Sequence, residues 1–370
     1  MKRTILALAL LVSSAAAAGP RDLVIALGGD VSFHHGWFNA KLDKVGESPG
    51  PFSLIQSYLD EADLRFLNLE APVTEGSAVI KKTYSLAMPP HRLAWIVKAG
   101  FNLISLANNH TADAGVEGLA ATIANLQKVR DGGTDLWWAG ADPDASKADA
   151  VTYLTPEGKE LKVAFLAFGN NRAPEVASFW GKRVTERVKE ARASADLVLV
   201  SIHAGKEYDH VAEPDLARRY RGLIDAGADV IIGHHPHVVR GVERYKHGVI
   251  LYSLGNLSFA SFTVRHHETG AKMWGMLPMV YVTDGKLSRL RIVPLWVSHN
   301  EKLVVEGEPA LPPTPFQPQP LTGGHARAAL DAFQRFSDAV EGNATRLAID
   351  GDEANLDLTG SAGGSGAASP

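Results

Sequence analysis

The sequence predicts an α/β protein, and three observations support this fold class. Apolar runs of strand length alternate with amphipathic, helix-like segments along most of the chain. Six of these runs are followed directly by a short polar cluster, for example GGD at 28–30 and NNH at 108–110. Two strand-like stretches near the end, 277–283 and 287–296, follow each other without a helix between them. We therefore expect an α/β sheet system with an antiparallel ending.

The first half of the chain alternates strands with helices. Apolar residues recur at helical spacing in three segments, which predicts helices at 51–62, 91–99 and around 116–126. The strands expected in this half are 22–28, 64–68 and 101–106.

The second half repeats the pattern. The strands expected here are 161–167, 197–202, 229–232 and 249–254. A charged helix is expected at 182–195, and Pro214 begins another that ends near Gly227, because proline is favoured at the first position of a helix. Residues 306–321 are rich in proline and expected to be extended, and a last helical pattern covers 326–340.

The first 18 residues have the features of a secretory signal peptide. Lys2 and Arg3 precede a short apolar run, which ends at three small residues, the alanines 16–18. This run is too short to span a bilayer readily, and no other long apolar run follows. We therefore expect an extracytoplasmic protein, periplasmic or secreted, with no transmembrane helix in the mature chain.

The composition of the chain excludes nucleic acids as partners, and the character of its segments predicts how the chain divides into units. Among 370 residues, 37 Lys and Arg stand against 41 Asp and Glu, so no basic excess exists to neutralise phosphates and no nucleic-acid partner is expected. The Gly/Ser/Ala-rich end of the chain cannot bury a core and is expected to be disordered. The expected units are a signal peptide at 1–18, a main domain at 22–300, a proline-rich segment with a helix at 301–345, and a disordered tail at 346–370.

The polar clusters after the strands predict a metal site. Ligands of open α/β sheets bind at the carboxyl edge, so side chains that follow separate strands are expected to meet there. Carboxylates, amide oxygens and imidazoles are the donor set of a divalent metal site. The residues expected to hold one or two ions, of Mn, Zn, Fe or Ca, are Asp30, Glu70, Asn109, His203, His235 and His237.

Each of these residues, taken alone, also suits a structural role. Asp30 is a plausible turn cap, and Glu70 a partner of Arg65 or of a lysine. Asn109 is a plausible turn residue, and a histidine after a strand is often a hydrogen-bonded core residue. Their convergence at one sheet edge favours the metal site.

The segment HHPH at 234–237 is interpreted through its proline. The residue before a proline favours extended geometry, and side chains two apart in an extended chain face the same way. His235 and His237 are therefore expected to point together as a ligand pair, with His234 as a bystander on the other side. The alternative for this segment is a solvated turn.

The remaining polar residues are assigned to catalysis or support. An uncoordinated His110 is expected to act as a general acid or to hold the reacting oxygen. Asn68, Asn256 and Asp113 are assigned to supporting positions around the metal or the substrate. The alternative for Asn256 is a turn residue, and for Asp113 the sequence favours a helix N-cap over a ligand.

Several segments resemble one family and occur in its order: GGDVSF at 28–33, NLEAPVT at 68–74, AGFNLISLANNHTADAG at 99–115, HAGKEY at 203–208, GHHPHVVRGVE at 233–243 and YSLGNLSF at 252–259. The chain resembles the CapA family of poly-γ-glutamate capsule synthesis proteins, which have a calcineurin-like metallophosphoesterase fold. The resemblance implies a four-layer αββα sandwich, and it implies the same metal positions with His110 in the acid or orienting role. Two positions depart from the phosphoesterase pattern. Ser32 stands where those enzymes have a histidine, and Glu70 where they have an aspartate.

The resemblance implies a function and leaves two alternatives. The first hypothesis is a secreted, metal-dependent, hydrolase- or transferase-like protein of capsule synthesis that acts on an anionic or peptide-like envelope polymer such as poly-γ-glutamate. Its partners would include an envelope capsule-synthesis complex. The alternatives are a metal-dependent phosphomonoesterase or phosphodiesterase, and a non-catalytic export or assembly component that binds polymer.

Overall fold

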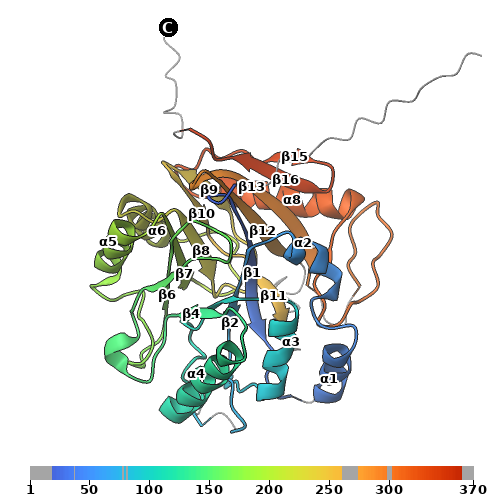
Figure 1. The fold of residues 1–370 in the computed structure, drawn as a ribbon. Coiled ribbons are helices and arrows are strands. Elements are labelled where there is room, and N and C mark those ends of the chain that lie inside the picture. Colours follow the sequence, from blue (N-terminus) through green and yellow to red (C-terminus); the bar gives the residue numbers. More distant parts are fainter. Residues whose placement is uncertain are drawn as a thin grey trace, which may run out of the picture.

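The structure, a computed structural model, describes residues 19–36, 38–76, 79–80, 82–260, 274–297 and 302–360. The predicted signal peptide at 1–18 and residues 361–370 of the predicted tail lie outside these ranges. Strands of the described residues form two sheets at the centre of the molecule, with helices around them (Figure 1).

The first sheet carries both parallel and antiparallel strands. Its order is β15-β16-β13-β12-β1-β2-β3-β4, with β11 beside β1 and β14 beside β13. Parallel pairing joins β1 (Leu23–Ser32), β2 (Leu64–Leu69), β3 (Leu103–Ser105), β4 (Trp137–Ala139) and β11 (Asn256–Phe259). Antiparallel pairing adds β12 (Trp274–Thr283), β13 (Lys286–Trp296), β14 (Gln319–Pro320), β15 (Ala348–Asp350) and β16 (Glu353–Asp357). The antiparallel ending predicted for the sheet system is confirmed.

The second sheet has a parallel centre and antiparallel edges, in the order β5-β6-β7-β8-β10-β9. Its parallel strands are β6 (Val163–Gly169), β7 (Leu197–His203), β8 (Val230–His234) and β10 (Gly248–Leu251). Its edges are β5 (Thr152–Leu154) and β9 (Val242–Tyr245).

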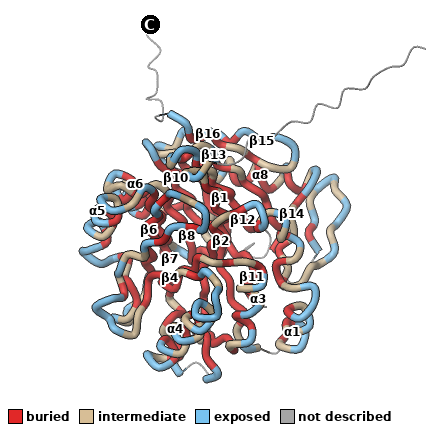
Figure 2. The backbone as a smooth tube through the Cα atoms, viewed as in Figure 1, coloured by how far each residue is buried: buried red, intermediate tan, exposed pale blue. Residues whose placement is uncertain are grey.

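Alternating side chains show how the layers stack. In β7, Leu197 and Leu199 join the core that includes the first sheet, whereas Val198 and Val200 pack with α5 (Val184–Ser194) and α6 (Pro214–Asp225). This period of two is that of a strand buried on both faces. The outer helices on the other side are α1 (Asn39–Glu47), α2 (Gln56–Asp60), α3 (Leu93–Lys98), α4 (Gly115–Asp131) and α8 (Gly323–Asp338). Burial is greatest along the central strands (Figure 2), and the four-layer αββα prediction is confirmed.

Part of the predicted tail is ordered, which corrects the boundary at 346. β15 and β16 form a hairpin, and β16 pairs with β13 from Arg289↔Asp357 to Ile292↔Ala354. Alternate residues of β16, Ala354 and Leu356, are buried by this pairing. The disordered-tail prediction is therefore wrong for 348–357. Within the described residues, no helix combines the length and apolarity needed to cross a membrane.

Candidate metal centre

The site lies where the carboxyl ends of strands from both sheets meet. Asp30 ends a Gly-Gly step in β1, where a side chain on Gly29 would lie 2.1 Å from the Gly255 carbonyl oxygen. That close approach requires glycine, and it lets the Asp30 amide donate to the same carbonyl at 3.1 Å. Glu70 follows β2, and His203 ends β7 on the face turned to the first sheet. The fold therefore brings residues far apart in sequence to one buried point.

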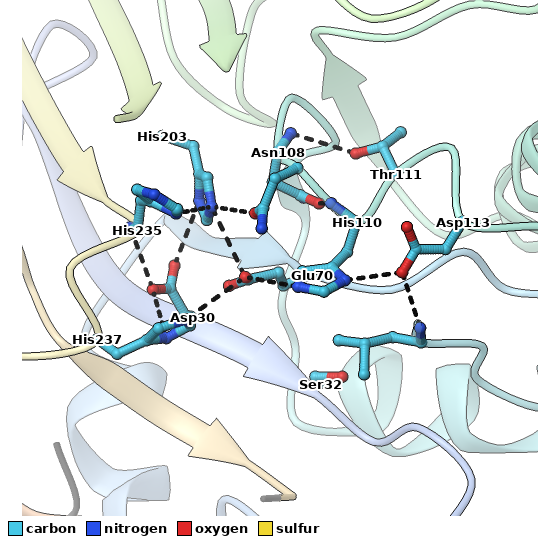
Figure 3. Close-up of polar contacts among 12 residues, drawn as sticks. Asp30, Ser32, Glu70, Asn108, His110, Thr111, Asp113, His203, His235 and His237 are labelled. Atoms are coloured by element: carbon cyan, nitrogen blue, oxygen red, sulfur yellow. Dashed lines mark hydrogen bonds and ion pairs between the residues drawn. The ribbon is translucent and has the colours of Figure 1, made fainter. Parts of the chain in front are cut away.

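Glu70 occupies the middle of the cluster (Figure 3). Its Oε1 lies 3.6 Å from His203 Nε2, 3.7 Å from His237 Nε2 and 3.9 Å from His110 Nε2. The side chain is fully buried, and neither carboxylate oxygen has a hydrogen-bond partner among the described residues. An unpartnered carboxylate inside a protein is costly unless a cation or a proton neutralises it. The environment of Glu70 is thus the most direct indication of a metal ion in this cluster.

Asp30 forms the second acidic side of the cluster. Its Oδ2 lies 3.5 Å from His237 Nδ1, and its Oδ1 lies 3.9 Å from His203 Nδ1. Asn68 donates to Asp30 Oδ1 at 2.8 Å, which holds the carboxylate in place. One ligand atom each from Asp30, Glu70 and His203 fall within 4.8 Å of one another. This spacing suits a shared ion.

Asn109 and His235 complete the predicted set. Asn109 Oδ1 lies 2.8 Å from His203 Nε2, and His235 Nδ1 lies 3.1 Å from the same nitrogen. His203 Nε2 can form a hydrogen bond with only one of these two atoms, because a ring nitrogen carries at most one proton. A bound cation would instead be faced by all three atoms. The structure thus brings all six predicted ligands together, and their role as ligands stays a prediction.

The geometry of HHPH differs from the predicted one. His235 and His237 have φ values of 94° and 59°, in the left-handed region and not in the extended one. Their rings nevertheless converge, with centroids 6.4 Å apart. His234 continues the β8 face of Val230 and Ile232, and its Nδ1 lies 3.1 Å from Asp30 Oδ1. The bystander interpretation of His234 is therefore wrong.

His110 is paired with Asp113, whose carboxylate has three partners. Asp113 Oδ2 lies 2.7 Å from His110 Nδ1 and accepts from the Leu86 amide at 2.7 Å. Asp113 Oδ1 lies 2.6 Å from the ammonium of Lys82. The N-cap of α4 is Ala114, without a side-chain cap, so the N-cap alternative for Asp113 is wrong. The contact of Asp113 Oδ2 with His110 Nδ1 orients the His110 ring and leaves its Nε2 directed at Glu70.

Asparagines support the ligand shell. Asn108 donates to Asn68 Oδ1 at 3.2 Å and to the Leu69 carbonyl at 2.8 Å, which ties the loop after β3 to β2. Asn256 is paired with Asp30 across β11 and β1, and its Oδ1 lies 2.9 Å from His237 Nδ1. A hydrogen bond of this kind fixes the orientation of a ligating imidazole.

Ser32, the departure in the first motif, takes no part in this cluster. Its hydroxyl lies 2.9 Å from His34 Nδ1, and Figure 3 shows it apart from Asp30 and Glu70. The His34 ring packs against the Phe38 ring, and the two ring centroids lie 5.6 Å apart. His34 does not belong to the Asp30–Glu70–His203 group of potential ligands.

The electrostatics of the cluster fit a cation. Burial, reinforced by the charge of Asp30, raises the pKa of the Glu70 carboxyl well above its usual range. Burial and the neighbouring His235 hold the pKa of His203 well below its usual range, and burial lowers the pKa of His235 to about 4. Neutral imidazoles are the form that binds a metal ion, and a buried carboxyl that holds a proton in the absence of a cation releases it when a cation binds. The residues present therefore fit a divalent cation.

Two residues near the site escaped the sequence analysis. Lys82 carries no motif, and only the fold places its ammonium beside Asp113 and 2.8 Å from the Asn109 carbonyl. The buried Arg240 binds the carbonyls of Lys206 and Asp209, at 2.9 Å and 2.7 Å. The loop that it holds carries Tyr208, whose ring stacks on His237 with centroids 6.2 Å apart. The one feature of the sequence that could have indicated a role for Arg240 is its position shortly after the HHPH segment.

Comparison with known proteins identifies relatives of this chain. A family model described as "Bacterial capsule synthesis protein PGA_cap" matches residues 24–261. The capsule biosynthesis protein CapA of Bacillus anthracis is 29% identical over 264 residues, which cover 66% of this chain and 60% of that protein. The PGA biosynthesis protein CapA of Bacillus subtilis is 30% identical over 227 residues, which cover 59% of this chain and 60% of that protein. The matched part of this chain thus spans 60% of the length of both relatives.

A third relative and two solved structures extend the comparison. A probable polyglutamine synthesis accessory protein of Mycobacterium tuberculosis is 29% identical over 64% of this chain and 66% of its own length. A structure described as a novel phosphatase from Mycoplasma pneumoniae has a TM-score of 0.45 at 16% identity, covering 74% of this chain and 93% of that one. A hypothetical protein from Thermus thermophilus has a TM-score of 0.42 at 18% identity, covering 81% of this chain and 98% of that one.

Proposed function

The chain belongs to the PGA_cap family of bacterial capsule synthesis proteins, and from this premise we propose that it is an extracytoplasmic, metal-dependent enzyme that acts on poly-γ-glutamate or a similar anionic, peptide-like envelope polymer. The observation that carries the proposal is the buried Glu70 carboxylate, which has no hydrogen-bond partner among the described residues and faces three imidazoles. The printed names of the relatives support capsule or poly-γ-glutamate synthesis as the setting.

Six residues of the cluster are proposed as ligands of the cation: Asp30, Glu70, Asn109, His203, His235 and His237. When bound, a divalent cation would supply Lewis-acid polarisation of a substrate oxygen or a lowered pKa of water. Asn68 and Asn256 hold Asp30 and His237 in orientation by their hydrogen bonds.

His110 is the residue proposed to move a proton. Its Nδ1 is held by Asp113, so its Nε2 is the atom that faces the cluster and a substrate there. Asp113 fixes the ring and favours a proton on Nδ1, while burial lowers the pKa of the imidazole. The neutral ring would accept a proton at Nε2 from a water that attacks a γ-amide carbonyl, and would then deliver that proton to the leaving amine.

The test uses the mature protein with a γ-linked glutamate oligomer and added Mn²⁺ or Zn²⁺, with the chain-length distribution followed by mass spectrometry. We expect the wild type to change that distribution, and His110→Ala to lose turnover while it keeps its metal. His247→Ala is the matched control, since this exposed histidine contacts the Ala228 carbonyl and lies outside the cluster.

The alternatives give different results. Turnover of phosphate esters without any change in the oligomer would favour the phosphoesterase alternative. Metal and polymer binding without turnover, in wild type and His110→Ala alike, would favour the non-catalytic export or assembly component.

A further inference from the structure

A cavity opens along the loop that follows β6, and this loop contacts segments of the candidate metal centre. Its volume is about 490 Å³, and its lining includes Asn171, Arg172, Asp149, Ser178 and Arg183. None of these residues belongs to the predicted ligand set. The cavity is therefore a separate feature that the proposed chemistry leaves unexplained.

Hydrogen bonds tie this cavity to the two segments that carry the predicted ligands. The Asn171 amide nitrogen donates to the Asn108 carbonyl at 2.8 Å, directly before Asn109. The Asn170 backbone amide donates to the His203 carbonyl at 2.9 Å. One loop thus lines the cavity and contacts the backbone of two segments that carry predicted ligands.

The charges of the cavity favour an anion. Asp149 is bound by Arg187 at 2.9 Å, with Arg183 farther away at 3.5 Å. Arg187 also pairs with Glu190 at 2.8 Å, and the side chain of Arg183 is more than half exposed, so its guanidinium is accessible. Arg172 is exposed and forms no hydrogen bond or ion pair within the part of the chain that the structure describes. Arg172 and Arg183 thus present two exposed guanidinium groups in a lining that contains one carboxylate, Asp149.

We propose that this cavity is a second subsite, in which Arg172 and Arg183 bind carboxylates of the polymer chain whose backbone lies at the metal cluster. The inference rests on the proposed function, because it takes the substrate class from there. Guanidinium groups bind carboxylates through paired hydrogen bonds, and a polymer with a carboxylate on every residue presents one at each step into the cavity. The subsite would select anionic over neutral chains.

The test measures binding and needs no turnover. A short γ-linked glutamate oligomer is titrated calorimetrically into the wild-type protein, and the same oligomer with its side carboxylates amidated serves as the neutral probe. We expect Arg172→Gln to weaken binding roughly fivefold and the double variant Arg172→Glu/Arg183→Glu by about tenfold or more, since exposed attractive contacts become repulsive. Binding of the acidic oligomer should weaken further as salt rises.

Arg218→Glu is the matched control. Arg218 is exposed on α6, pairs with Asp215 and does not line the cavity. We expect this variant to bind the acidic oligomer like the wild type, with all variants retaining the wild-type circular dichroism spectrum and melting temperature.

Three results would overturn the subsite: equal affinity of the double variant and the wild type, equal affinity of acidic and amidated oligomers, or no binding of the acidic oligomer to the wild type. Failure of the proposed function is distinguishable. Arginine-dependent binding in a protein that takes up no metal and turns over no oligomer would support the subsite and refute the metal-dependent chemistry.

Discussion

Asp113 Oδ2 lies 2.7 Å from His110 Nδ1, and this contact leaves His110 Nε2 directed at the buried Glu70 carboxylate. Removing the charge of Asp113 weakens the orientation of the ring. We expect Asp113→Asn to lower turnover of the γ-glutamate oligomer by about 10–100-fold, the usual cost of losing such a supporting partner. Mass-spectrometric rates measure this, and Asp215→Asn on the exposed face of α6 is the control. An unchanged rate in Asp113→Asn would remove His110 from the mechanism.

The pH dependence of stability reports on Glu70. Burial and the charge of Asp30 raise the pKa of its carboxyl well above 4.5 in the folded protein. A proton held more tightly in the folded state stabilises the protein fully below pH 4.5, and this stabilisation is lost as pH rises toward the folded pKa. We therefore expect the metal-free wild type to lose more stability over this range than metal-free Glu70→Gln. Urea denaturation across pH measures it, and identical profiles would contradict the burial argument.

Arg240 is expected to stabilise the loop next to the site. Its guanidinium satisfies the carbonyls of Lys206 and Asp209 and pairs with Glu213 at 2.8 Å. Arg240→Ala leaves these groups without their partner, and we expect the free energy of unfolding to fall by about 2–4 kcal/mol. Denaturant titration measures the loss. Arg218→Ala, which removes an exposed ion pair, should change stability by less than about 1 kcal/mol, and an equally small effect of Arg240→Ala would refute the anchoring role.

The terminal hairpin is expected to be part of the fold. Deleting 346–370 removes β15 and β16, exposes the edge of β13 and loses the buried Leu356 with the bidentate Arg291–Glu353 pair. We expect a loss of about 3 kcal/mol or more from the apolar burial alone, with aggregation through the freed edge. Deleting only 361–370 should leave the melting temperature unchanged. Equal melting temperatures of both truncations would contradict the pairing.

The site residues at the strand ends were predictable because each of them directly follows an apolar run in the sequence. Asp30, Glu70 and His203 each follow a run that the fold buries, so sequence order alone places them at one edge. His234 was misassigned because the extended geometry assumed before Pro236 does not occur, whereas the alternation of β8 predicts its inward position. Backbone strain of this kind depends on tertiary packing, which local rules do not contain.

Other features depend on contacts between distant segments. Lys82 reaches Asp113 only because the loop before α3 folds over the start of α4. The hairpin at 348–357 has few apolar residues, and its order comes from pairing with β13 and not from its own composition. A composition rule therefore extended the disordered tail too far toward the N-terminus.

The central claim is that the cluster around Glu70 and His203 binds a divalent cation. The direct measurement is metal content by inductively coupled plasma mass spectrometry, on the mature wild type and on Glu70→Gln, after saturation with Mn²⁺ or Zn²⁺ and removal of unbound ions. The account predicts one or two ions per wild-type chain and a clear loss in Glu70→Gln, with His247→Ala unchanged. A wild type that retains no ion, or a Glu70→Gln variant that retains as much as the wild type, would contradict it.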